Sequence, residues 1–131
     1  MAGSFTDYLE TKLLDHTFRN VAYTSPGAVY LGLFTAAPSD TGGGTELSGN
    51  AYARQAVTMA TSGTSPTLTT NSAAVEFPTA TASWGTLVAV AVFDASTSGN
   101  MLAWADLASN RTVGSGDIFR VPANDLDITL A

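Results

Sequence analysis

The sequence of 131 residues has no cysteine, a single histidine and a single lysine, and only 12% of its residues are charged. Without cysteine, neither a disulfide framework nor a thiolate metal site can form. Five basic residues, scattered along the chain, stand against eleven acidic ones, which gives a net charge of −6. A surface that binds nucleic acid needs clustered Lys and Arg to release counterions. The charge balance therefore argues against nucleic acid as a partner.

Long hydrophobic runs are also missing. The longest is LVAVAVF at residues 87–93, which is far shorter than the ~20 residues that span a bilayer. The opening MAGSFTDYLE has no basic region followed by an apolar run, and so does not look like a signal peptide. We therefore expect a soluble protein with no membrane partner.

Small side chains are abundant instead. Ala, Thr, Ser and Gly make up about half of the chain. Charged residues make up only 12% of it, whereas they make up roughly 25% of a typical globular domain. A surface of small, uncharged side chains suits flat packing against neighbours. The composition therefore favours self-assembly, although a simple sheet protein with polar loops would have a similar composition.

Residues 4–20, SFTDYLETKLLDHTFRN, form the one segment that predicts an amphipathic helix. Ser4 followed by Asp7 matches a capping-box pattern. The helix carries two apolar stripes, because one side chain in three or four recurs on the same face. The first stripe contains Phe5, Tyr8, Leu9 and Leu13, and the second contains Leu14, Phe18 and Val21. Two stripes predict a helix that lies between its own domain and a neighbour; alternatively, the helix ends near Asp15 and the chain turns inward.

The remainder predicts short strands separated by Gly, Pro, Ser and Asn. Residues 29–35 are apolar on both sides of the pleat, as in a strand covered on both faces. Residues 87–93 and 101–107 form a predicted hairpin, and residues 126–130 alternate like a half-solvated strand. Helices do not alternate with strands, which excludes a parallel α/β sheet. We predict a single domain over residues 1–131, with the helix at 4–20 and an antiparallel, jelly-roll-like β-sandwich at 28–131.

No catalytic, metal or cofactor site is predicted. His16, the only histidine, has no nucleophile and orienting carboxylate placed to form a triad. Asp125 and Asp127 share one face of the last predicted strand, where they either lie in solvent or hold a cation. Like charges on an exposed edge strand also deter edge-to-edge pairing. The pattern therefore argues against an enzyme.

Exposed aromatic side chains could stack on sugars, although most aromatic residues serve packing. Trp104 alternates with Leu102 in an apolar strand, which predicts a core position. Trp84 precedes Gly85 and is expected at a sheet margin. Trp84 is therefore the candidate contact for a host-surface glycan, in an alternative reading of the chain as a carbohydrate-binding module.

The order of features along the whole chain resembles a family of small tailed-bacteriophage virion proteins, usually labelled phage tail fibre proteins. The resemblance rests on the following segments: SFTDYLETKLLDHTF, YTSPGAVYLGLFTAAPSD, YARQAVT, EFPTATASWGTLVAVAVFDASTSGNMLAWADL and GSGDIFRVPANDLDITL. One departure is PAND at residues 122–125, where a glycine is expected in the last turn.

This resemblance implies a structural component of the virion, assembled in the host cytoplasm, with no enzyme activity and no cofactor. It leaves open a tail fibre component or a capsid decoration or cement protein, with capsid or tail proteins as partners. Self-association, as a trimer, is also expected. The predicted interface consists of apolar residues of the leading helix: Phe5, Tyr8, Leu9, Leu13, Leu14 and Phe18.

Overall fold

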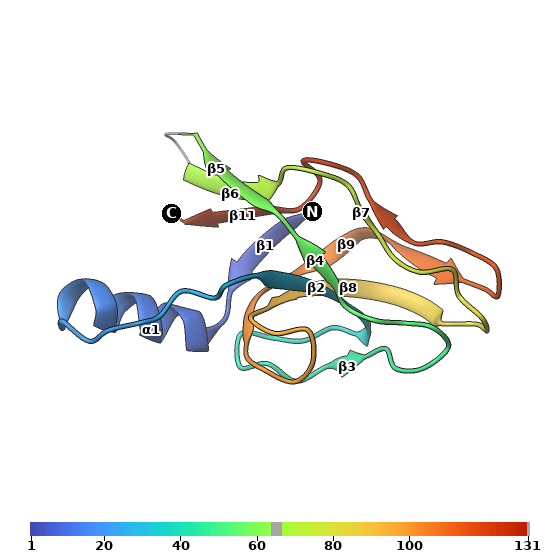
Figure 1. Ribbon diagram of the computed structural model, residues 1–131, viewed down its shortest axis with the longest axis horizontal. Helices are drawn as coiled ribbons and strands as arrows, with labels where there is room; N and C mark the ends of the chain where they lie inside the picture. The colour runs from blue at the N-terminus through green and yellow to red at the C-terminus, as the bar shows by residue number, and fades with distance from the viewer. Residues whose placement is uncertain (64–66, 131) are drawn as a thin grey trace.

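The computed structural model describes residues 1–63 and 67–130 and shows a mainly β protein with one helix near the N-terminus (Figure 1). This confirms the predicted fold class. The elements are, in chain order, β1 (Ala2–Phe5), α1 (Asp7–Phe18), β2 (Val29–Ala36), β3 (Thr45–Glu46), β4 (Gln55–Val57), β5 (Met59–Ser62), β6 (Thr67–Asn71), β7 (Val75–Glu76), β8 (Gly85–Phe93), β9 (Met101–Val113), β10 (Arg120–Val121) and β11 (Asp127–Leu130).

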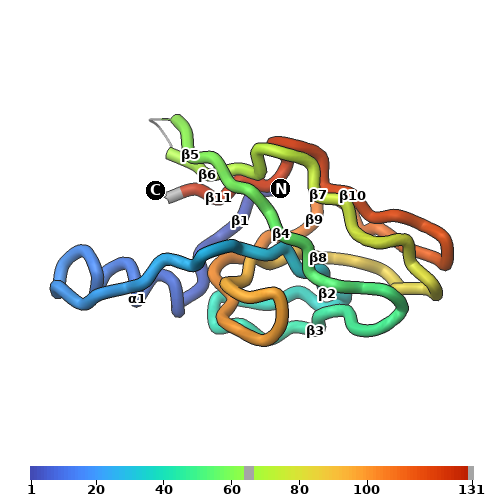
Figure 2. Tube along the Cα trace, viewed as in Figure 1, coloured from blue at the N-terminus to red at the C-terminus, as the bar shows by residue number. Residues whose placement is uncertain are grey.

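Nine strands form one sheet in the order β3-β2-β8-β9-β1-β11-β6-β5, and β4 also pairs with β2. Only Thr58 separates β4 from β5, yet β4 pairs with β2 and β5 pairs with β6. The segment 55–62 therefore connects strands near opposite ends of the order. The sheet folds over on itself into two sandwich-like layers (Figure 2). A separate ribbon is formed by β7 and β10.

The main core lies between the layers. It contains aliphatic residues from β2, β8 and β11 together with the rings of Phe77, Trp84 and Phe119. The ring of Tyr52 packs edge-on against Trp84, with 5.8 Å between the ring centroids. A second, smaller cluster consists of Phe34, Ala89, Ala91 and Phe93. All four residues 31–34 of β2 are buried, which confirms that this strand is covered on both faces.

The predicted hairpin at residues 87–93 and 101–107 is confirmed as β8 and β9. β9 continues to Val113, six residues further than predicted. The prediction missed this part of the strand because residues 108–112 are exposed and lack an apolar pattern. The pairing shifts register between Leu87 and Ala89 and again between Val92 and Phe93. Such irregularities bend a strand pair, and this bend helps the sheet to fold over.

The helix begins later than predicted. Residues 2–5 form β1, so Ser4 lies in a strand and Thr6 is the N-cap. β1 lies between β9, to which it is antiparallel, and β11, to which it is parallel. A Cβ at Gly3 would lie 3.1 Å from the Trp104 backbone oxygen, so this tight position suits glycine. The β1–β11 pair is parallel, and this one pair departs from the antiparallel arrangement that the sequence predicts.

The last strand is also placed differently. β11 pairs with β1 on one side and with β6 on the other. It is therefore an interior strand, and the interpretation of Asp125 and Asp127 as guards of an exposed edge is wrong. In the turn before β11, Asn124 has a φ of 62°. Asparagine tolerates this left-handed conformation, which explains how the turn forms without the expected glycine.

Candidate functional site

The most distinctive feature is an arm that extends from one end of the body, formed by α1 and the returning segment 19–28 (Figure 1). Thr6 fixes its base: the Thr6 side chain is buried, and its Oγ1 donates to the backbone oxygen of Met101 at 2.7 Å. The Thr6 Oγ1 also accepts the Leu9 N–H at 3.4 Å and so caps the helix. The Asp7 N–H donates to the Asp40 backbone oxygen at 2.8 Å. The start of the arm is thus bonded to β9 and to the loop after β2.

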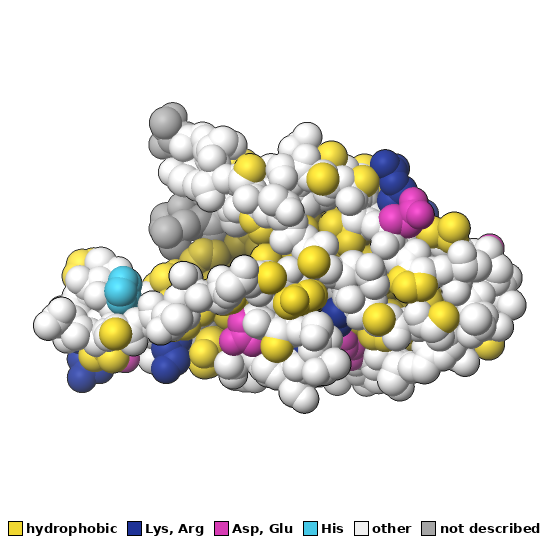
Figure 3. Space-filling view, in the orientation of Figure 1, with side chains coloured by type: hydrophobic (Ala, Val, Ile, Leu, Met, Phe, Trp, Pro, Cys, Tyr) yellow, Lys and Arg dark blue, Asp and Glu magenta, His cyan; other side chains and the backbone are white. Residues whose placement is uncertain are grey.

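Beyond its base, the helix is poorly covered, and none of its residues is buried. Tyr8 and Leu9 pack partly against the main core. Further out, the side chains of Leu14, Phe18 and Val21 are 58%, 78% and 45% exposed. We call these three residues the apolar tip. Figure 3 shows hydrophobic side chains on the surface of the arm, which stands clear of the body.

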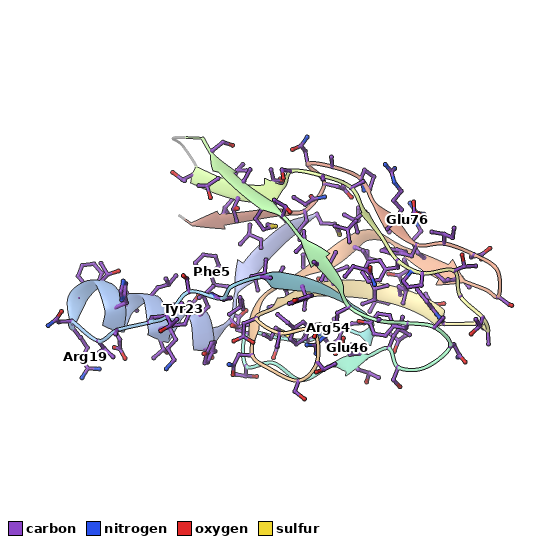
Figure 4. The ribbon with its side chains drawn as sticks, viewed as in Figure 1. Phe5, Arg19, Tyr23, Glu46, Arg54 and Glu76 are labelled. Atoms are coloured by element: carbon purple, nitrogen blue, oxygen red, sulfur yellow. The ribbon has the colours of Figure 1, made fainter. Side chains whose placement is uncertain are left out.

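The far end of the arm is held by local contacts. Arg19 forms an exposed ion pair with Asp15 at 3.0 Å, and Figure 4 places Arg19 at the end of the arm. Asn20 has a φ of 58° and reverses the chain. The Tyr23 N–H then donates to Nδ1 of His16 at 3.3 Å. His16 therefore connects the helix to the returning segment, which is a structural role.

Comparison with known proteins shows the family of the chain. A sequence profile of the family described as Podophage GP4 fiber I protein gp80 matches residues 4–129. The chain belongs to this family. Membership makes it a structural protein of a bacteriophage virion, of the fibre type. A search of the curated proteins finds no significant match.

The structure divides the predicted interface residues of this fibre-family protein into two groups. Phe5 lies in β1 and packs, with Tyr8 and Leu9, against the protein's own core. Leu13 is partly exposed, whereas Leu14 and Phe18 belong to the apolar tip. The two predicted stripes thus differ in their surroundings: most of the first packs against the body, and the second is largely exposed.

The two tryptophans occupy the reverse of their predicted positions. Trp84 is 4% exposed, and its Nε1 donates to the Asn50 backbone oxygen at 2.9 Å. A ring buried in this way cannot stack on a sugar, so the predicted glycan contact at Trp84 is wrong. Trp104 is only partly buried, and its Nε1 donates to Asp40 Oδ1 at 2.9 Å. Of residues 79–83, which precede Trp84, only Ala80 is buried, and Trp84 itself lies directly before the start of β8 with its ring turned into the core.

A polar cluster that sequence reasoning missed lies next to the Phe93 ring. Arg54 donates to both carboxylate oxygens of Glu46, at 2.7 and 2.8 Å, and Tyr52 donates to Glu46 Oε2 at 2.6 Å. Burial, followed by the bond to Glu46, raises the pKa of the Tyr52 hydroxyl above its ordinary value. The hydrogen bond to Glu46 also raises the pKa of Arg54. Figure 4 shows Glu46 and Arg54 side by side.

This cluster is occupied internally. The remaining Arg54 nitrogen, Nη1, donates to the backbone oxygens of Ala95 at 3.0 Å and Ser98 at 2.7 Å. The cluster therefore fastens the turn between β8 and β9 to the segment between β3 and β4. Tyr52 and Arg54 are two positions apart, so in an extended segment their side chains point to the same side. Nothing in the sequence indicated Glu46 as their partner.

Within residues 1–63 and 67–130, no three His, Asp or Glu side chains are grouped as a metal site would require. In the same part of the chain, no helix has the length and apolar character needed to cross a bilayer. Asp125 lies just before β11 and Asp127 within it. The geometry offers an attachment surface at the apolar tip more clearly than any reactive centre.

Proposed function

We propose that this chain is a non-enzymatic fibre component that attaches to the phage tail through the apolar tip and assembles there as a homo-oligomer. Family membership supports the fibre assignment. One observation carries the attachment: large apolar side chains stand exposed on an arm that the body does not cover. Exposed apolar patches commonly mark interaction sites, whereas single exposed residues need no explanation.

The size of the apolar tip supports attachment in several copies. Burying a large apolar side chain contributes roughly 1.5–3 kcal/mol. Three such side chains cover much less than the ~800 Å² per partner that a specific, stable interface buries. Copies arranged around a symmetry axis would combine their contributions. We therefore propose a closed oligomer, with three copies as the expected number.

If the chain decorated the capsid instead, the same tip would bind a capsid protein. We favour the tail because the family is described as a fibre protein. The reading as a lectin-like module based on Trp84 has no support, because that ring is buried. The proposal that the chain is not an enzyme is supported by the role of its one histidine, His16, in holding the arm.

The test replaces the apolar tip without disturbing the body. Leu14→Ser with Phe18→Ser should leave the far-ultraviolet circular dichroism of the body unchanged and should abolish oligomers in light scattering. In phage complemented with this variant, mass spectrometry should find little of it in purified particles. The matched control is Ile118→Ser, which changes a residue that is 52% exposed in the loop joining β9 to β10.

That loop lies at the end of the body away from the arm (Figure 2), so the control variant should assemble and incorporate normally. Normal incorporation of the Leu14→Ser, Phe18→Ser variant would refute attachment through the tip. Cryo-electron microscopy of wild-type particles would separate a tail location from a capsid location.

A further inference from the structure

The large sheet ends in an open edge strand, β5 (Met59–Ser62). It stands last in the strand order, and β6 is its sheet partner in the part of the chain that the structure describes. Its residues Ala60, Thr61 and Ser62 are exposed. Figure 1 shows β5 at the upper margin of the body, apart from the arm. One long side of β5 is therefore free to pair with a further strand.

The pairing with β6 determines which backbone groups of β5 point outward. At the start of this ladder, the Ser72 N–H donates to the Thr58 backbone oxygen at 2.9 Å. Hydrogen-bonded and non-hydrogen-bonded positions alternate along an antiparallel pair, so every second residue after Thr58 bonds to β6. The residues between them are Met59 and Thr61, whose N–H and C=O groups point away from β6. Within residues 1–63 and 67–130, these groups have no hydrogen-bond partner.

β5 also lacks the features that usually protect an edge strand, which are a charged side chain, a proline or a bulge. It contains none of these, and no residue from 55 to 75 is charged. The other edges are different. β3 contains Glu46, and the two strands of the β7–β10 ribbon contain Glu76 and Arg120. β4 lies against β7. Among the described strands, β5 is thus the edge best suited to pairing with another chain.

We propose that β5 pairs with β5 of a second copy, antiparallel, about a two-fold axis that passes beside Ala60. In this register, Met59 of each copy faces Thr61 of the other, and every outward N–H meets an outward C=O. Ala60 faces Ala60 of the second copy in a non-hydrogen-bonded pair, where the Cα atoms are about 4.5 Å apart. The small methyl groups fit this close approach. The free groups of β5 are therefore complementary to themselves, which favours a second copy as the partner.

The contact is small, and its stability rests on the proposed homo-oligomer. Four residues on each copy bury far less than the ~800 Å² per partner of a stable interface. The pairing alone therefore does not hold two free chains together. Copies gathered through the apolar tip present several β5 edges at once, and such multivalent contacts reinforce one another. The tip lies on the arm and β5 on the body (Figure 1), so the two contacts do not compete.

A disulfide can trap the pairing, because the chain has no cysteine of its own. Ala60→Cys places two thiols opposite each other, at a Cα separation that a disulfide spans. Under mild oxidation this variant should form a linked dimer in non-reducing electrophoresis. Ser62→Cys is the matched control, since Ser62 is also exposed on β5 but lies about 13 Å from its copy in this register. No dimer with Ala60→Cys, or equal linkage with Ser62→Cys, would overturn the pairing.

Lysine substitutions test whether the same contact forms in the particle. Ala60→Lys places two like charges directly opposite each other, which is unfavourable. In complemented phage, it should lower the amount of the protein in purified particles several-fold relative to Ser62→Lys. Equal amounts of the two variants would overturn the pairing as a contact of the assembled particle. If Ala60→Lys is depleted although Ala60→Cys forms no dimer, the edge binds a strand of a different virion protein, and the second-copy assignment is overturned.

These outcomes are distinguishable from failure of the attachment proposal. Oligomers in light scattering that Ala60→Cys fails to link would overturn the β5 pairing and leave the apolar tip as the oligomer contact. Combined with Leu14→Ser and Phe18→Ser, Ala60→Cys should link more slowly, because the copies are no longer gathered. Equally fast linkage would confirm the pairing and refute its dependence on the tip.

Discussion

The side chain of Arg54 links Glu46 to the turn between β8 and β9. Its side chain is only 8% exposed. The guanidinium lies over the Phe93 ring, 3.5 Å from the centroid, and is bonded to Glu46 and to two backbone oxygens. A buried charge is costly unless its hydrogen bonds are made. Here Arg54 makes four hydrogen bonds, and these offset the desolvation of the ion pair.

Replacing Arg54 with Met should therefore lower the free energy of unfolding by about 3–5 kcal/mol, because Glu46 is left as an unpaired, partly buried charge. Methionine keeps much of the side-chain volume, so the loss reports on charge rather than on a cavity. Urea denaturation followed by circular dichroism measures it. Arg19→Met is the matched control: its ion pair with Asp15 is exposed, and such pairs contribute about 0–1 kcal/mol. Similar losses in both variants would contradict this account.

Residue positions were predicted less well than residue types. Trp84 and Trp104 have similar local sequences, with small residues on both sides, and the sequence alone does not show which ring the folded-over sheet encloses. Glu46 and Arg54 meet because β3 and the segment after it return along β2. The arginines at 111 and 120 seemed scattered, and the turn between β9 and β10 brings them to one pocket. All three outcomes depend on contacts that no local pattern encodes.

At the scale of elements, the leading helix shows which part of a pattern is reliable. Its amphipathic spacing predicted a helix and two stripes, and the helix is present at Asp7–Phe18. Its start was missed because Ser4 and Thr6 are both good N-caps. Pairing of residues 2–5 between β9 and β11 decided in favour of Thr6. The helix is therefore held to the body by β1, which directly precedes it. A truncation of the N-terminus would damage the sheet as well as the arm.

Thr6→Val tests this anchor with almost no change of side-chain shape. The substitution removes the N-cap and leaves the Met101 backbone oxygen without the Thr6 donor, so we expect a loss of about 1–3 kcal/mol. Thr11→Val, in the same helix but exposed, should change stability by no more than a few tenths of a kcal/mol. Amide hydrogen exchange should be faster across α1 in Thr6→Val. Unchanged exchange in α1 would show that Thr6 does not hold the arm.

At the scale of the whole molecule, the mainly β class and the helix at the N-terminal side followed from composition and periodicity. The folding-over of the sheet did not follow. β4 and β5 follow each other within residues 55–62, yet they pair with different strands on either side of Thr58. Alternation of apolar residues specifies which face is buried, but it does not specify which distant strand is the neighbour. The core that results contains residues from Leu31 to Ile128, which argues for one cooperative unit.

Cooperativity of the whole body is testable with one substitution in each layer. Leu87 lies in β8, and Leu126 lies beside β11; both are fully buried in the same core. Leu87→Ala and Leu126→Ala should each lower the free energy of unfolding by about 2–5 kcal/mol. In both variants, tryptophan fluorescence and far-ultraviolet circular dichroism should report one coincident transition, as a two-state domain requires. Leu14→Ala, in the apolar tip, should leave that transition within about 0.5 kcal/mol of the wild type. If Leu126→Ala instead produced an early transition in circular dichroism while the fluorescence midpoint stayed fixed, the two layers would fold separately. The segment 55–62 would then be a linker between two separately folding layers rather than a part of one cooperative sheet.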